Sequence, residues 1–265
     1  MNHVRILTIA ASLALAAILG AGCGDDSSNR EAPKKSSKPE KAPRVVEAPK
    51  PGEGGTIAGR ILFDGEAPKP RAIAFGGERK CAELHGDQAP VMEDLVVGTD
   101  GGIRWVLVHV ASPDLGSFDA PTAKAVIDQK GCLFHPHVAA VQVGQPVEFL
   151  NSDPVLHNVR AQPTLNEAVN IAQPEKGSST TIEFAQPELG IGLKCDVHFW
   201  MAGWVHVFTH PYFAVTAEDG SFEIRGLKDG TYTIETWHEK LGTQKREVVV
   251  KDGQITQADV TYRAN

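Results

Sequence analysis

From Thr56 onward the sequence alternates short runs of apolar and polar residues, and it shows no sustained helical period. A period of two is typical of β-strands that bury one face, so the pattern predicts an all-β fold. Asp-Gly pairs separate several of the runs, and glycine accepts the positive φ that tight hairpins require. We therefore predict tight connections at Asp64-Gly65, Asp219-Gly220, Asp229-Gly230 and Asp252-Gly253.

A hydrophobic content of 42% is sufficient for a packed core. The predicted strands are Thr56–Phe63, Arg104–Val110, Val138–Val143, Val147–Asn151, Thr180–Phe184, Gly203–Phe208, Tyr212–Ala217, Ser221–Ile224, Thr231–Trp237, Lys245–Val250 and Thr256–Tyr262. None of them precedes Thr56, so the N-terminal part of the chain needs a different explanation.

The N-terminal segment has the pattern of a secretory signal. Arg5 precedes an apolar run over Ile6–Leu19, and small residues follow up to Cys23. The run is shorter than the about 20 apolar residues that a membrane-spanning helix needs. We therefore expect an exported protein, with residues 1–23 as its signal peptide.

The end of this segment, Gly20-Ala21-Gly22-Cys23, resembles the cleavage box of bacterial lipoproteins, in which small residues precede an invariant cysteine that receives the lipid. The resemblance implies lipidation at Cys23 and a membrane anchor in the cell envelope, facing the periplasm or at the cell surface. Gly20 departs from the box, where an aliphatic residue is usual. An ordinary signal peptide cut near Gly22, which leaves a free thiol, is the alternative.

Residues 24–54 are rich in Pro, Lys, Glu and Ser. Such a segment buries too little apolar surface to fold, so we expect a disordered, flexible tether. The chain carries a formal net charge of −7, and its lysines are concentrated in this tether rather than on a folded face. Nucleic acid is therefore not an expected partner.

Two motifs contain residues that bind soft transition metals. The first, in residues 144–159, places His157 shortly after a predicted strand. The second contains Cys195, His198 and Met201 directly before another predicted strand. A thiolate, two imidazoles and a thioether stabilise copper in both oxidation states, because soft sulfur favours Cu(I) and nitrogen accommodates Cu(II). The sequence therefore predicts a copper site.

The pattern G-x-x-V-x-F-x-N-x-D with a downstream H-N-V, and the pattern C-x-x-H-x-x-M, resemble the ligand regions of the blue-copper proteins, or cupredoxins. The short spacing of the second pattern is that of amicyanin, whereas plastocyanin-like loops are longer. The resemblance implies one type 1 copper ion, with His157, Cys195 and His198 as equatorial ligands and Met201 as the weak axial ligand. It also implies that Asn158 braces the site through hydrogen bonds to the ligand loop. Zinc is the alternative, although Met is an unusual zinc ligand.

The four cysteines can then all be assigned. If Cys23 carries the lipid and Cys195 binds metal, Cys81 and Cys132 remain as a pair. The oxidising environment of the cell envelope favours a disulfide between them. Two separate buried thiols are the alternative.

Several histidines lie outside the two motifs. His135 and His137 follow Cys132 with a C-x-x-H spacing, which makes them candidate additional ligands, and surface histidines beside a disulfide are the competing interpretation. His206 and His210 follow the second motif, where strand alternation predicts that they face solvent.

Phe199 and Trp200 lie between His198 and Met201. In cupredoxins the edge of this histidine emerges through an apolar surface where redox partners dock, so the resemblance implies that the two aromatic residues form part of a partner patch. Alternatively, they cover the metal and pack against Trp204.

The last third of the chain carries a DG-S-F turn, a G-L-x-x-G-x-Y segment and a V-V-V-K-D-G ending. These features resemble the carboxypeptidase regulatory-like, or transthyretin-like, β-sandwich. The opening strand of that sandwich, G-x-I-x-G-x-I, stands at Gly55. Together the two resemblances imply two β-sandwiches of Greek-key type: a discontinuous one over residues 55–115 and 211–263, and the cupredoxin-like one inserted at 120–210. Two consecutive sandwiches that share an edge are the alternative.

Two functions agree with these features. The first is an envelope-anchored electron carrier that passes single electrons between redox proteins, such as a cytochrome or a dehydrogenase. The second is a non-catalytic cell-surface binding or scaffold protein in which copper is absent or incidental, and copper storage or delivery is a further alternative. The sequence contains no G-x-S-x-G, H-E-x-x-H, phosphate loop or multicopper-oxidase cluster, so we do not expect an enzyme.

Overall fold

The structure, a computed structural model, describes residues 53–113, 115–116 and 118–263 of the 265-residue chain. All of these residues belong to one unit of the chain. The predicted signal peptide, the lipidation residue Cys23 and most of the predicted tether lie outside the described residues. Within the described part, no helix has the length and apolar character needed to cross a membrane.

The described residues have the all-β fold that the alternation predicts. The strands are β1 (Gly55–Asp64), β2 (Val96–Val97), β3 (Ile103–Arg104), β4 (Leu107–Val110), β5 (Ala125–Gln129), β6 (Phe134–His135), β7 (Val138–Gln142), β8 (Val147–Asn151), β9 (His157–Ala161), β10 (Val169–Gln173), β11 (Ser179–Ile182), β12 (Glu188–Lys194), β13 (Ala202–Phe208), β14 (Phe213–Val215), β15 (Ser221–Leu227), β16 (Gly230–His238), β17 (Gly242–Val250), β18 (Ile255–Gln257) and β19 (Val260–Arg263). A short helix, α1 (Arg79–Glu83), lies between β1 and β2.

The strands from β5 to β13 form two sheets that share one hydrophobic core, and we call them the central sandwich. One sheet has the order β10-β9-β12-β13-β7, and the other has the order β11-β8-β5-β6. Ile127 and Phe149 from one sheet and Val159, Leu193 and Val205 from the other belong to the same buried cluster. This core fixes the strand ends that carry the candidate metal ligands.

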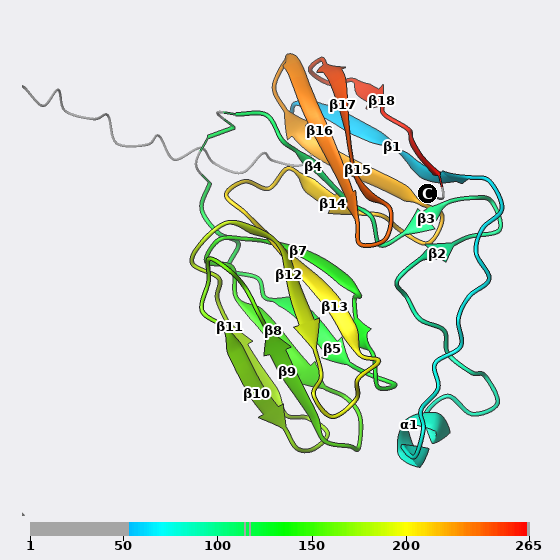
Figure 1. Ribbon diagram of the computed structural model, residues 1–265. Helices are drawn as coiled ribbons and strands as arrows, with labels where there is room; N and C mark the ends of the chain where they lie inside the picture. Colours follow the sequence, from blue (N-terminus) through cyan, green and yellow to red (C-terminus); the bar gives the residue numbers. More distant parts are fainter. Residues whose placement is uncertain (1–52, 114, 117, 264–265) are drawn as a thin grey trace, which may run out of the picture. The chain divides into compact units, whose positions relative to one another are not determined.

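The remaining long strands, β1, β4 and β14–β19, form a second pair of sheets, which we call the terminal sandwich. β1 pairs antiparallel with β15 and parallel with both β18 and β19. The other sheet has the order β14-β4-β16-β17. Figure 1 shows the blue strand β1 beside the red strand β18 from the far end of the chain. The first described strand and the last ones therefore complete a single sheet.

The predicted Asp-Gly connections agree with the structure at three of the four positions. Gly65, Gly220 and Gly253 have φ values of 116°, 76° and 65°. At Gly220 a Cβ atom would lie 2.4 Å from the backbone oxygen of Ile61, so this position also has no room for a side chain. The prediction of a positive φ is wrong at Gly230, because the chain passes there from β15 in one sheet to β16 in the other instead of forming a hairpin.

A disulfide joins Cys81, in α1, to Cys132, in the connection between β5 and β6. The alternative of two separate buried thiols is therefore wrong. The bond ties the segment between β1 and β2 to the central sandwich, and Phe75 of that segment lies 5.1 Å from Trp200, measured between ring centroids.

We expect the double variant Cys81→Ala with Cys132→Ala to lose about 4 kcal/mol of unfolding free energy. The disulfide closes a loop with a sequence separation of 51, and its removal restores the corresponding entropy to the unfolded chain. Guanidinium denaturation followed by tryptophan fluorescence measures the change. Wild type in the presence of a thiol reductant should match the variant, and equal stability of oxidised wild type and variant would contradict the expectation.

The prediction that His206 and His210 face solvent is wrong. Their side chains are 0% and 8% exposed. The ring of His206 contacts Trp237 of β16, with 4.5 Å between ring centroids, and the neighbouring Trp204 contacts the same residue. β13 therefore has no solvent-facing side at this level, because the terminal sandwich covers the face that alternation assigns to water.

The buried histidines should make the fold acid-sensitive. Burial, together with the charge of nearby His109, lowers the pKa of His206 from 6.5 to about 3. As the pH falls below about 6.5, the unfolded chain binds a proton that the folded protein does not, so stability decreases until the pH approaches 3. When the pH is lowered from 7 to 5, the unfolding free energy of wild type should decrease by about 2 kcal/mol more than that of His206→Gln. Urea titrations at the two pH values measure both decreases. An equal loss in both proteins would be inconsistent with a buried, neutral His206.

Candidate metal centre

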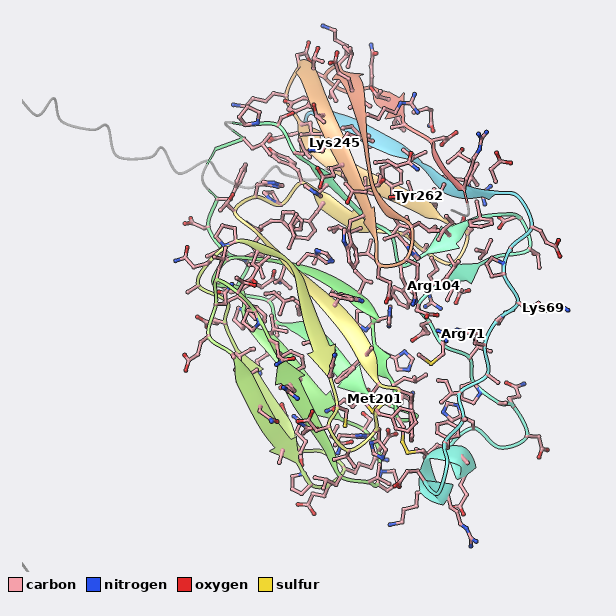
Figure 2. All side chains as sticks on the ribbon, viewed as in Figure 1. Lys69, Arg71, Arg104, Met201, Lys245 and Tyr262 are labelled. Atoms are coloured by element: carbon pink, nitrogen blue, oxygen red, sulfur yellow. A yellow bond between two sulfur atoms is a disulfide. The ribbon has the colours of Figure 1, made fainter. Side chains whose placement is uncertain are left out.

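Three adjacent strands position the four predicted ligands. His157 begins β9, Cys195 directly follows β12, and His198 and Met201 lie in the loop before β13. β9 pairs with β12, and β12 pairs with β13, in antiparallel register. The ends of the two motifs, far apart in the sequence, are thereby brought to one edge of the sheet. Figure 2 labels Met201 in this loop.

The donor atoms of three of these residues form one compact group. The Nδ1 atoms of His157 and His198 are 2.9 Å apart, and Sγ of Cys195 is 3.7 Å from Nδ1 of His198. All three donors fit within 4.8 Å of one another, which is close enough for a single ion. His157, Cys195, His198 and Met201 are each at most 3% exposed.

The ligand loop is closed by its own backbone. The N–H of Met201 donates to the carbonyl of His198 at 2.9 Å, and the N–H of Cys195 donates to the carbonyl of Met201 at 3.4 Å. Met201 therefore cannot leave the loop without breaking two backbone hydrogen bonds. These bonds fix the backbone of the loop that carries Cys195, His198 and Met201.

Asn158 lies where the resemblance implies a brace. The backbone N–H of Asp196 donates to its Oδ1 at 2.6 Å, and its Nδ2 donates to the Asp196 carboxylate at 3.2 Å. Asp196 is the residue after Cys195. Asn158 therefore connects β9 directly to the start of the ligand loop.

Asp153 is a buried residue of the site whose role the sequence analysis missed. Its Oδ2 lies 2.9 Å from Nε2 of His157, and its side chain is almost completely buried. The pattern N-x-D four residues before the histidine contains it, but its meaning depends on two backbone amides, at Gly131 and Cys132, that only the fold brings into contact.

Contacts among Cys195, His157, His198 and Asp153 shift the pKa values of this group. Burial raises the pKa of the Cys195 thiol, but hydrogen bonds from His157 and His198 outweigh this effect and lower the pKa to about 6. Burial lowers the pKa of His157, but its contacts with Asp153 and Cys195 raise it above its ordinary value. The pKa of Asp153 is lowered, because the hydrogen bonds it accepts outweigh its desolvation. Cys195 is thus poised to be a thiolate near neutral pH.

The candidate additional ligands His135 and His137 lie apart from this group. Nε2 of His137 hydrogen-bonds to the Glu239 carboxylate, and Nε2 of His135 lies 3.1 Å from the carbonyl of Lys130. Among the described residues, the side-chain groups with metal-binding geometry include neither histidine.

Phe199 and Trp200 have different environments. Phe199 is 84% exposed, whereas Trp200 is buried with its ring 5.2 Å from that of His198. Nε1 of Trp200 donates to the carbonyl of Cys132 at 3.0 Å, and Trp204 contacts Trp237 instead. Trp200 therefore covers the site, whereas Phe199 projects from the ligand loop.

His198 is the ligand candidate nearest to a surface depression. It lines a cavity of about 500 Å³ whose walls come from four segments: the start of α1, the β8–β9 connection, the β10–β11 connection and the ligand loop. Leu156, Pro174 and Val197 form the apolar side, and Arg79 of α1 forms part of the other. The disulfide-linked segment thus contributes to the rim around His198.

Similarity to known proteins is limited to solved structures, because no protein-family model and no curated protein matches the sequence. Amicyanin from Paracoccus versutus is similar with 20% identity and a TM-score of 0.29, over 38% of this chain and 96% of amicyanin. A purple cupredoxin from Nitrosopumilus maritimus has 21% identity and a TM-score of 0.27, over 32% of this chain and 98% of its own. A copper-containing nitrite reductase from Thermus scotoductus has 22% identity and a TM-score of 0.29, over 38% of this chain. The match covers 25% of that reductase.

We expect Asn158→Ala to destabilise the protein by about 1–3 kcal/mol, because it leaves the backbone N–H of Asp196 without its acceptor in a partly buried position. Asn170→Ala is the matched control, since Asn170 is exposed and contacts only the side chains of Asn158 and Asp196 among the described residues. The control should change stability by less than about 0.5 kcal/mol. Urea denaturation of both variants checks this, and equal effects would contradict the bracing role.

Proposed function

We propose that this protein binds one type 1 copper ion through His157, Cys195, His198 and Met201 and transfers single electrons. The observation that carries the proposal is the compact, buried group of a thiol and two imidazole nitrogens. Copper at this site would supply one-electron exchange between Cu(I) and Cu(II). The protein would catalyse no reaction on its own.

The residues present fit copper in three respects. Cys195, with its lowered pKa, offers a thiolate, which is the soft ligand that copper prefers. Two neutral nitrogens suit the oxidised ion, and the Met201 thioether is a weak ligand that zinc sites rarely use. Burial of all four side chains excludes water, so the reduced and oxidised ions would meet the same ligands.

Rigidity of the site supports electron transfer over metal storage. The hydrogen bonds within the loop and from Asn158 hold the donors in one arrangement, so little rearrangement accompanies a change of charge. A storage or delivery protein needs a site from which the ion leaves readily. Ligands that are at most 3% exposed do not favour such release.

The surface near His198 is the proposed route for electrons. Phe199 is exposed beside it, and an apolar cavity wall reaches the histidine itself. Lipidation at Cys23 and a flexible tether would keep this surface near the membrane, where a cytochrome or a dehydrogenase of the envelope would exchange electrons with it. A binding or scaffold role without copper gives no reason for a buried thiol next to two histidines.

The first test compares Cys195→Ser with wild type after loading of the full chain with Cu(II). We expect wild type to show an intense thiolate-to-copper absorption band and a narrow copper hyperfine splitting in electron paramagnetic resonance. Cys195→Ser should lose the band, because the charge transfer starts from its thiolate. His135→Ala, outside the donor group, is the control and should keep both signals.

The alternatives give different results in the same experiment. A colourless wild type without stoichiometric copper would overturn the proposal and favour the scaffold role. Zinc bound in preference to copper would also contradict it. Tight copper binding without reversible voltammetry would favour storage or delivery over electron transfer.

A further inference from the structure

We infer that Asp153 is a positioning residue that keeps a proton on Nε2 of His157, so that Nδ1 is the ligand atom, and that its carboxylate favours the oxidised ion. The inference deepens the proposed function and rests on it. The observation behind it is the contact of a buried carboxylate with the outer nitrogen of a candidate ligand.

The carboxylate is fully engaged by donors. The backbone N–H of Gly131 donates to Oδ1 at 2.7 Å, and the backbone N–H of Cys132 donates to Oδ2 at 2.7 Å. Nε2 of His157 lies 2.9 Å from the same Oδ2. Asp153 is only 2% exposed, so these three donors compensate for the loss of water around its charge.

The partners determine which nitrogen of His157 carries the proton. An ionised carboxylate only accepts hydrogen bonds, so Nε2 must donate to Asp153. Nδ1 points the other way, toward Nδ1 of His198 at 2.9 Å. When the proton of a neutral imidazole is on Nε2, the lone pair of Nδ1 is available to a metal. Asp153 thus selects the nitrogen that lies within the donor group.

Local backbone geometry holds the carboxylate in place. Gly131 and Cys132 both have positive φ, 64° and 55°, and for Cys132 this conformation is uncommon. Their consecutive amides point at the carboxylate as a result. On the other side, the N–H of Asp153 donates to Oδ1 of Asn151 at 2.9 Å. The carboxylate is therefore held by the segment that forms the disulfide and by His157, and the bond to Asn151 fixes the backbone from which it extends.

The carboxylate would have an electronic effect as well as a geometric one. A carboxylate that accepts from the outer nitrogen of a ligand histidine makes the inner nitrogen a stronger ligand. A negative charge close to the ion also stabilises Cu(II) more than Cu(I), because the Coulomb term scales with the charge of the ion. Both effects lower the reduction potential.

Asp153→Asn tests the inference, because it preserves size but removes the charge and replaces one acceptor with a donor. Asp128→Asn is the matched control: Asp128 accepts from the Ser152 hydroxyl at 2.9 Å and is outside the donor group. The full chain is used for wild type and both variants. Chelator competition gives the affinities for Cu(II) and Cu(I), voltammetry gives the potential, and nitrogen-15 NMR of histidine reports the protonated nitrogen.

We expect Asp153→Asn to weaken Cu(II) binding about 10- to 100-fold and Cu(I) binding less. Each tenfold difference between the two losses raises the potential by about 59 mV. Asp128→Asn should change neither quantity. In wild type, Nε2 of His157 should be protonated both without metal and with Cu(I).

The outcomes separate this inference from the copper proposal. An unprotonated Nε2 in metal-free wild type would overturn the inference, and this measurement decides the matter even if Asp153→Asn fails to fold. Unchanged affinities and potential in a folded Asp153→Asn protein would also overturn it while leaving the copper proposal intact. If wild type binds no copper, the proposed function fails, and the NMR result on the metal-free protein still decides whether Asp153 positions His157.

Discussion

The antiparallel pairing of β9, β12 and β13 is the constraint on which the rest of the site depends. Lys194 at the end of β12 pairs with Arg160 in β9 and with Ala202 at the start of β13. The residues just beyond these pairs are therefore forced together, with Cys195 between His157 on one side and the loop into β13 on the other. Burial of the central core holds the three strands in this register, since a slip of one residue would turn the apolar side chains outward. The donor atoms are therefore close together because of the pairing register of the three strands.

The sequence alone predicts much of this arrangement, because the candidate ligands lie in two short motifs next to strands. The disulfide is also predictable from the number of cysteines if Cys23 and Cys195 have the other roles that the sequence analysis assigns to them. The role of Asp153 cannot be identified from the sequence, since its partners are backbone amides of the β5–β6 connection, more than 20 residues away in the sequence. His206 was misjudged for a related reason. Alternation indicates which side chains share a face of a strand, but it does not indicate whether a second sandwich covers that face.

Three elements that the sequence pattern does not predict, β9, β12 and α1, have physical features that explain why. β12 alternates correctly, but Gly190 and Gly192 interrupt its side chains, and glycine weakens a strand signal. β9 begins at His157, shortly after the segment Asn151–Pro154, whose residue types are typical of turns. α1 has only five residues, too few for a helical period to appear, and the disulfide at Cys81 helps to hold it. In each case tertiary contacts, rather than local propensity, stabilise the element.

Cys132 shows how the chain outside the ligand loop takes part in the site. Its N–H donates to Asp153, which contacts His157, and its carbonyl accepts from Trp200, whose ring lies against His198. A single peptide segment therefore supports both histidines. The same residue is bonded to Cys81, so a disulfide ties the segment between β1 and β2 to the candidate metal site. Loss of the disulfide would lower stability, and it would also remove a restraint on the backbone of Gly131 and Cys132, whose amides donate to the carboxylate of Asp153. Stability and ligand geometry are coupled at this residue, although it never touches the metal in the proposed site.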